Sequence, residues 1–169
     1  MTNDQIFDEL ERNGVVFETL LHDLPEEMLR WRPAEGKWNL LDVLCHLIDE
    51  EREDFRVRVT SILQDPNAAL PSIDPEGWVL QHNYQNQDYE KILDSLLEER
   101  EKSVDRLRSI KSPNWDNQYN HPKLGGMSAQ LFLENWLAHD HLHMRQIIAI
   151  KFAYLKECGS EPLNYAGNW

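Results

Sequence analysis

Three of the chain's seven histidines fall within residues 139–146, HDHLHMRQ. Imidazole is the commonest protein ligand for transition metals, so the direction of these side chains decides what they could do. In a strand, His139, His141 and His143 would all line one side, because successive side chains alternate between faces. In a helix, His139 and His143 stack one turn apart and His141 points elsewhere.

Two imidazoles at positions i and i+4 of a helix have Cβ atoms roughly 6 Å apart and can converge on one cation. The metalloprotease motif HExxH uses this spacing, but the glutamate base of that motif is absent here. The alternative is a pair of core histidines satisfied by hydrogen bonds, although four ring nitrogens would then need partners.

The surrounding periodicity favours the helix. Residues 128–157 carry a stripe spaced by three or four positions: Phe132, Trp136, His139, His143, Ile147, Ile150 and Tyr154. Ser128 suits the N-cap, and Gly159 follows the end. A strand would require two breaks without Gly or Pro, so His139 and His143 are predicted to share the inward face.

Three further segments show helical periodicity, over residues 4–22, 40–65 and 88–110. Asn39 is a suitable N-cap for the second, and Pro66 ends it. The connectors between them contain Pro and Gly, and the one after Asp65 is long. No alternating run has the length of a strand, so the sequence predicts an all-α fold. With 169 residues the chain suits one domain, 1–169.

Composition excludes several classes of partner. The formal net charge of −13 would repel nucleic acid. The chain opens with no signal peptide and contains no apolar run of membrane-spanning length, so we expect neither a nucleic-acid nor a membrane partner. Two cysteines form no disulfide framework, and a cytoplasmic location is the expectation. We expect Cys45 to be a buried, inert thiol.

A third ligand would turn the histidine pair into a metal site, and His46 is the candidate. It lies beside the apolar stripe of the second helix and would meet the pair if that helix packs against the fourth. Three protein ligands leave a coordination position open, as in catalytic sites. The alternative is that His46 binds no metal and is a partly buried polar residue at the edge of the stripe. Asp49 and Glu50 could orient an imidazole or bind metal but are interpreted as part of a solvated acidic run. Gln146 could hold a ligand ring or substrate, and the alternative is an ordinary polar contact.

The connectors contain residues that could cover an open end of the helices. They are His82, His121, Trp78, Tyr84, Trp115 and Tyr119. They either wall a substrate pocket or anchor the long connectors by packing.

The segment WRPAEGKWNLLDVLCHLIDEERE, followed about ninety residues later by WLAHDHLHMRQI, resembles the DinB-like (DinB/YfiT) superfamily of metal-dependent enzymes. The shared pieces are W-x-P, a Trp and a polar cap before the second helix, its His-Leu pair, and the late H-x-x-x-H followed by Gln. The resemblance spans nearly the whole chain. It implies a four-helix bundle with long crossover connections and a divalent metal bound by His46, His139 and His143. Zinc or nickel is expected first, and iron, manganese and copper are also compatible with imidazole.

The resemblance implies a metal-dependent hydrolase or a transferase that uses a low-molecular-weight thiol such as bacillithiol, mycothiol or glutathione. The metal would activate water or the thiol against a small-molecule substrate, and no general base can be named from the sequence. The alternative is a non-catalytic bundle that binds a metal or small ligand, or an interaction scaffold. Apolar residues beside the inward stripe of residues 128–157, such as Leu133 and Ile148, also predict a homodimer.

Overall fold

The computed structural model describes residues 1–167, which are mostly helical. Four long helical rods make up most of it. The first is α1 (Asn3–Leu21), and the second is a continuous rod of α3 (Leu40–Asp49), η1 (Glu50–Phe55) and α4 (Arg56–Gln64). The third and fourth are α6 (Tyr89–Ser109) and α7 (Ala129–Cys158). Short helices lie in the connectors: α2 (Glu26–Arg30), α5 (Pro75–Gln81), η2 (Tyr84–Asn86) and η3 (Asn164–Ala166).

The predicted helix starts are confirmed by side-chain caps. Asn39 accepts a hydrogen bond from the Asp42 backbone N–H at 2.8 Å, and Asp42 accepts one from the Asn39 backbone N–H at 3.0 Å. This reciprocal capping box fixes where α3 begins. Ser128 accepts from the Leu131 backbone N–H and caps α7 in the predicted place.

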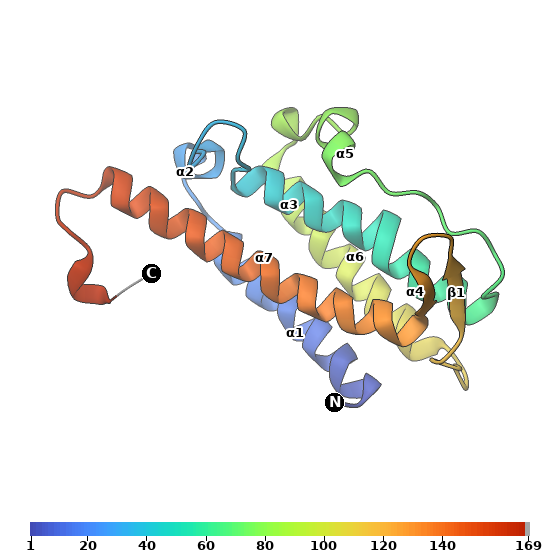
Figure 1. Cartoon of the computed structure of the whole chain (residues 1–169). Coiled ribbons are helices and arrows are strands. Elements are labelled where there is room, and N and C mark those ends of the chain that lie inside the picture. The colour runs from blue at the N-terminus through green and yellow to red at the C-terminus, as the bar shows by residue number, and fades with distance from the viewer. Residues whose placement is uncertain (168–169) are drawn as a thin grey trace.

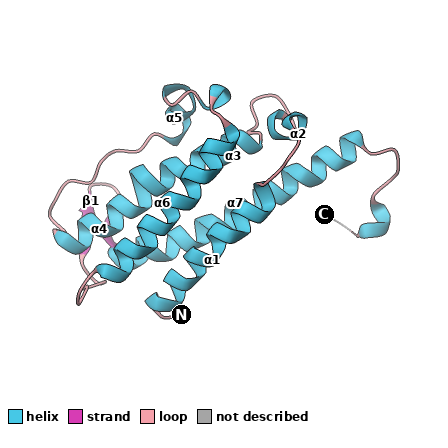
Figure 2. Ribbon diagram, turned by 180° about the vertical axis from the view of Figure 1, so that it is seen from behind, coloured by secondary structure: helices cyan, strands magenta, loops and turns pink. Residues whose placement is uncertain are grey.

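The rods form a four-helix bundle (Figure 1). Helix α1 packs between α6 and α7, and the rod from α3 to α4 packs on the other side against the same two helices. The connection from α4 to α6 returns along the length of the bundle, so α6 runs in the same direction as α3 (Figures 1 and 2). The predicted all-α bundle with long crossover connections is therefore confirmed.

Two local features depart from the sequence predictions. The connector before α7 forms a small antiparallel hairpin, β1 (Gln118–His121) and β2 (Gly125–Ser128), although it contains no strand-length apolar alternation. The second rod is interrupted by η1, a π-helical segment whose wider turn shifts the faces of α3 and α4 relative to each other. Periodicity did not predict it, because the residues on either side still follow a helical pattern.

The core consists of two apolar clusters with a polar layer between them. One cluster includes Phe17, Leu44 and Ile147, and the other includes Leu10, Val59 and Trp136. Each rod contributes buried polar residues between the two clusters: Asn13 on α1, Glu50, Glu51 and Asp54 on η1, Glu99, Arg100 and Ser103 on α6, and Asp140 and His143 on α7. These buried polar and charged side chains therefore lie in one cross-section of the bundle.

Helix α7 extends beyond the other rods at its C-terminal end (Figure 1). Of the apolar residues that suggested a dimer, Leu133 and Leu137 are buried within the chain, whereas Ile148 is 40% exposed. The homodimer stays a prediction. Among the described residues, no helix is both long and apolar enough to cross a membrane.

Candidate metal centre

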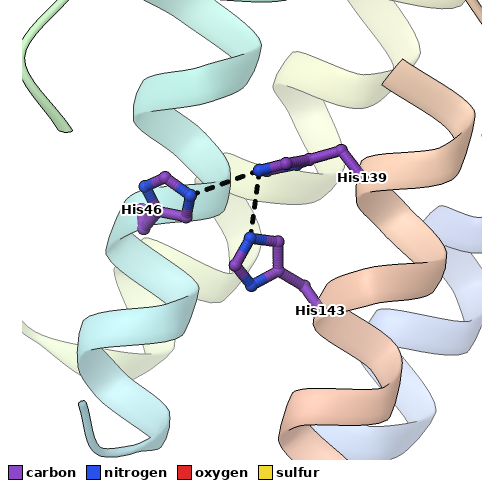
Figure 3. Close-up of side chains that lie close together, drawn as sticks. All are labelled: His46, His139 and His143. Atoms are coloured by element: carbon purple, nitrogen blue, oxygen red, sulfur yellow. Dashed lines mark hydrogen bonds between the residues drawn. The ribbon is translucent and has the colours of Figure 1, made fainter. Parts of the chain in front are cut away.

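The three predicted histidines meet in the polar layer, where α3 faces α7 (Figure 3). His139 Nε2 lies 3.3 Å from His46 Nε2 and 3.0 Å from His143 Nε2. One ligand nitrogen from each residue lies within 4.8 Å of the others. His46 and His143 are buried and His139 is half-buried, so the cluster reaches the surface on the His139 side.

These distances suit a shared cation better than hydrogen bonds between the rings. One imidazole nitrogen carries either a single N–H or a single lone pair, so His139 Nε2 cannot bond normally to both neighbours at once. Imidazole nitrogens about 2.0–2.1 Å from a zinc ion at near-tetrahedral angles lie roughly 3.3 Å apart. The donor set therefore fits a divalent metal with three protein ligands.

Burial keeps the three rings in the form that binds metals. It lowers the pKa of His46 to about 2 and that of His139 to about 4, with the neighbouring histidines adding to both shifts. Burial also lowers the pKa of His143, against the hydrogen bond that its Nδ1 donates to Gln146, which raises it. All three are neutral near pH 7, with lone pairs available for coordination.

A side chain one turn away orients the His143 ring. His143 Nδ1 donates to Gln146 Oε1 at 2.7 Å, which leaves Nε2 as the unprotonated nitrogen that faces the cluster. The predicted contact of Gln146 with a ligand ring is thus present. His46 Nδ1 is buried without a hydrogen bond, and Glu50 Oε1 lies 3.8 Å from it.

Two aromatic rings wall the cluster. The Trp38 ring lies 4.7 Å from the His46 ring, and the Phe55 ring lies 5.2 Å from the His139 ring, measured between centroids. Phe55 also stacks on Trp136 at 5.8 Å. The π-helical turn ends at Phe55, so the irregular segment brings this ring to the histidines.

A buried ion network beside the histidines went undetected in the sequence. Arg100 of α6 donates to both carboxylate oxygens of Asp140 at 2.6 and 2.8 Å and to Glu51 at 3.2 Å. Trp136 Nε1 donates to Glu51, and Asn13 donates to Asp140. Asp140 directly follows His139, so the network fixes α7 where it presents that ligand.

A signal for this network exists in the sequence. Arg100 continues the apolar stripe of Leu93, Leu96, Val104 and Leu107 at spacings of three and four, and a charged residue in such a stripe needs a buried partner. The charged run Glu98–Glu101 would by itself suggest a solvated face, which is wrong for Glu99 and Arg100, because both are buried.

The interpretation of Asp49 and Glu50 as part of a solvated run is also wrong. Asp49, Glu50, Glu51 and Asp54 are all buried, because the π-helical turn directs more of the rod toward its neighbours than a regular helix would. Burial and the nearby Asp54 raise the pKa of Glu50 to about 8, so this carboxyl is mostly protonated at neutral pH.

The connector aromatics do not gather around the three histidines. Trp78 and Tyr84 pack into the apolar cluster that contains Phe17, whereas Trp115 and Tyr119 pack against the cluster that contains Leu10. His121 lies in the hairpin beside Tyr119, and His82 lies beside Trp78. The anchoring role weighed in the sequence accounts for the packing of Trp78, Trp115 and Tyr119, whereas His82 and Tyr84 also line a cavity beside Asp49.

The family model of the DinB superfamily matches residues 9–147. The structure of YfiT from Bacillus subtilis, described as "a probable metal-dependent hydrolase with an unusual four-helix bundle topology", superposes with a TM-score of 0.78 at 19% identity, covering 88% of this chain and 85% of YfiT. The four-helix bundle protein TT2238 superposes with a TM-score of 0.56 at 19% identity, covering 88% of this chain and 99% of that protein. At this identity the two matches establish the fold. No curated protein matches the sequence.

Proposed function

The chain belongs to the DinB superfamily, and from this membership and its three clustered histidines we propose that it is a metal-dependent hydrolase. The observation that carries the proposal is the convergence of His46, His139 and His143 from two separate helices, with His139 Nε2 at 3.3 Å from His46 Nε2 and 3.0 Å from His143 Nε2. The description of YfiT as a probable metal-dependent hydrolase supports the same reaction class.

Three neutral imidazoles suit zinc or nickel first, and iron, manganese or copper are further candidates. A divalent cation held there supplies Lewis acidity, which gives a nucleophilic water at neutral pH. His46, His139 and His143 act as ligands, and Gln146 orients the His143 ring through its 2.7 Å hydrogen bond. Trp38 and Phe55 exclude water from two sides of the cluster, which strengthens electrostatic interactions within it.

A low-molecular-weight thiol is the alternative nucleophile for the same centre. A thiol would be activated by the same Lewis acid: on an ester or amide its sulfur would take the acyl group as a thioester, and the alcohol or amine would leave, in place of hydrolysis. Bacillithiol, mycothiol and glutathione are the thiols to compare. Water is the simpler assignment, because it requires no second binding site beside the substrate.

The first experiment measures metal content. Wild type and the His46→Ala, His139→Ala and His143→Ala variants are loaded with zinc, desalted and analysed for bound metal. The matched control is His141→Ala, an exposed histidine on the same helix. We expect about one zinc per chain in wild type and the control, and a large loss in the other three. Equal zinc in His46→Ala and wild type would remove His46 from the centre.

The second experiment measures catalysis. Zinc-loaded and chelator-treated protein are compared on chromogenic ester, amide and phosphate substrates, with and without each thiol. Hydrolysis that depends on zinc and on His139 supports the proposal. Product that appears only with a thiol identifies a transferase instead. Stoichiometric zinc binding without turnover in any arm would favour the non-catalytic metal-binding alternative.

A further inference from the structure

A second group of polar side chains surrounds a cavity on a different face of α3. The cavity has a volume of about 290 Å³ and lies between the α3–η1 rod, the turn from α5 to η2, and α6. Its lining includes Asp49, His82, Tyr84, Gln87 and Ile92, and none of the three clustered histidines. It is separate from the candidate metal centre, although both use side chains from α3.

Asp49 is the central polar group of this cavity. It is only 8% exposed, and one of its carboxylate oxygens, Oδ2, accepts hydrogen bonds from the Tyr84 hydroxyl at 2.5 Å and from His82 Nδ1 at 2.8 Å. Burial and the hydrogen bond to Asp49 raise the pKa of Tyr84, so its hydroxyl remains a donor. Two donors from the connector therefore fix the orientation of one buried carboxylate.

The other oxygen of Asp49 has no such partner. Among the described residues, Oδ1 makes no hydrogen bond. This oxygen is not fully buried, so part of its surface is accessible. Because Asp49 lines the cavity, this free acceptor opens onto it. A nine-tenths buried carboxylate with one bound and one open oxygen presents an open acceptor to whatever enters the cavity.

The neighbouring polar groups add further acceptors. Gln87 uses its Nε2 to donate to the His82 carbonyl at 2.7 Å, which leaves its Oε1 free. His82 contacts Asp49 through Nδ1, so Nε2 is the ring nitrogen that Asp49 does not engage. Glu53 lies exposed at the mouth, and Arg52 at the same mouth lies 3.4 Å from Glu99 on α6.

The apolar part of the lining comes from Cys45, Ile48 and Ile92. Burial raises the pKa of the Cys45 thiol to about 12, as expected for an inert thiol, so Cys45 contributes apolar surface rather than a nucleophile. A cavity of this size is at the small end of pockets that hold small molecules, roughly 300–1,000 Å³. The cavity therefore combines the carboxylate of Asp49 with the aliphatic side chains of Ile48 and Ile92.

We propose that this cavity binds a small organic ammonium ion, with its charged nitrogen at Asp49 Oδ1 and its alkyl part against Ile48 and Ile92. The ammonium N–H groups of the ligand would donate to the free acceptors of the cavity, such as Asp49 Oδ1 and Gln87 Oε1. In addition, the protein's net charge of −13 attracts cations to its surface. Asp49 is the specificity-determining residue, and Tyr84 and His82 position its carboxylate.

Three probes of equal chain length test the charge preference. Binding of n-butylammonium, n-butanol and n-butyrate to the wild-type protein is measured at pH 7 by ¹H–¹⁵N NMR titration. We expect n-butylammonium to bind at least about tenfold more tightly than n-butanol, because one charge-assisted hydrogen bond is lost in the alcohol. Equal binding of the ammonium ion and the alcohol would overturn the proposal. Preferential binding of butyrate would also overturn it and would identify Arg52 as the anchor.

Variants locate the binding. Asp49→Asn keeps the side-chain size and should weaken n-butylammonium binding at least about tenfold, whereas Asp94→Asn, an exposed aspartate on α6, should leave it unchanged. His139→Ala should also bind the probe normally, since the cavity excludes the histidine cluster. Loss of binding in His139→Ala, or undiminished binding in Asp49→Asn, would refute the assignment. The wild-type comparison of the three probes remains decisive if Asp49→Asn does not fold.

Discussion

Replacing Arg100 with methionine removes the cation that holds the polar layer together. The guanidinium is 4% exposed and contacts Asp140, Glu51 and the Leu10 carbonyl at 2.6 to 3.2 Å. Gly14 of α1 permits this packing, because a Cβ there would lie 3.3 Å from Arg100 Cγ. In Arg100→Met, two buried carboxylates lose their counter-ion while the surrounding helices still exclude water.

The expected cost follows from the burial of these partners. Glu51 and Asp140 are each 1% exposed, so neither can turn to solvent without moving a helix. Removing one partner of a buried ion pair typically destabilises a protein by about 3–5 kcal/mol. With 169 residues and an unfolding entropy of roughly 2.1 cal/mol/K per residue, that corresponds to a fall in Tm of about 8–14 °C.

Urea denaturation and thermal unfolding of metal-free protein measure this loss. The control is Arg106→Met, an exposed arginine on the same helix, which should change stability by less than about 0.5 kcal/mol. The loss in Arg100→Met should shrink between pH 7 and pH 5. A carboxyl whose pKa is raised in the folded state binds more protons folded than unfolded, so acidification favours folding. A loss below about 1 kcal/mol at pH 7, or one that grows on acidification, would refute this reasoning.

Three further changes test the surroundings of the histidines and the start of α3. Gln146→Leu should weaken zinc binding by about 10–100-fold in a chelator competition, because the His143 ring loses its Nδ1 acceptor; unchanged affinity would show that Gln146 does not orient the ligand. Wild type should lose at most roughly 4 kcal/mol of unfolding free energy between pH 5 and pH 8 in urea melts, because the raised pKa of about 8 keeps a proton on folded Glu50 over a range in which the unfolded chain has lost it. Glu50→Gln should remove this loss. Identical pH profiles for wild type and Glu50→Gln would contradict the burial argument. Asn39→Ala should cost about 0.5–2 kcal/mol by chemical denaturation through loss of the cap on α3, and a change near zero would mean that packing alone fixes this helix end.

The sequence by itself determined where the rods begin and end and which face of each is apolar. Asn39, Ser128 and the prolines of the connectors act through local hydrogen bonds and backbone geometry, so their effects can be read without knowing the neighbours. The i, i+4 spacing of His139 and His143 is equally local, because it depends only on the pitch of one helix. The resemblance to the DinB-like superfamily then connected His46 to this pair across ninety residues.

The tertiary structure decided which polar residues are buried together. Glu51, Arg100 and Asp140 lie on three different rods. The apolar stripe of α6 marks Arg100 as buried, but it does not say which carboxylates of the other rods are its partners. The π-helical turn and the cavity at Asp49 likewise depend on how α3 meets the connector and α6. Local pattern sets the direction of a side chain relative to its own helix. The neighbours that replace water around that side chain depend on the crossing of segments far apart in the chain, and that arrangement exists only after the bundle has packed.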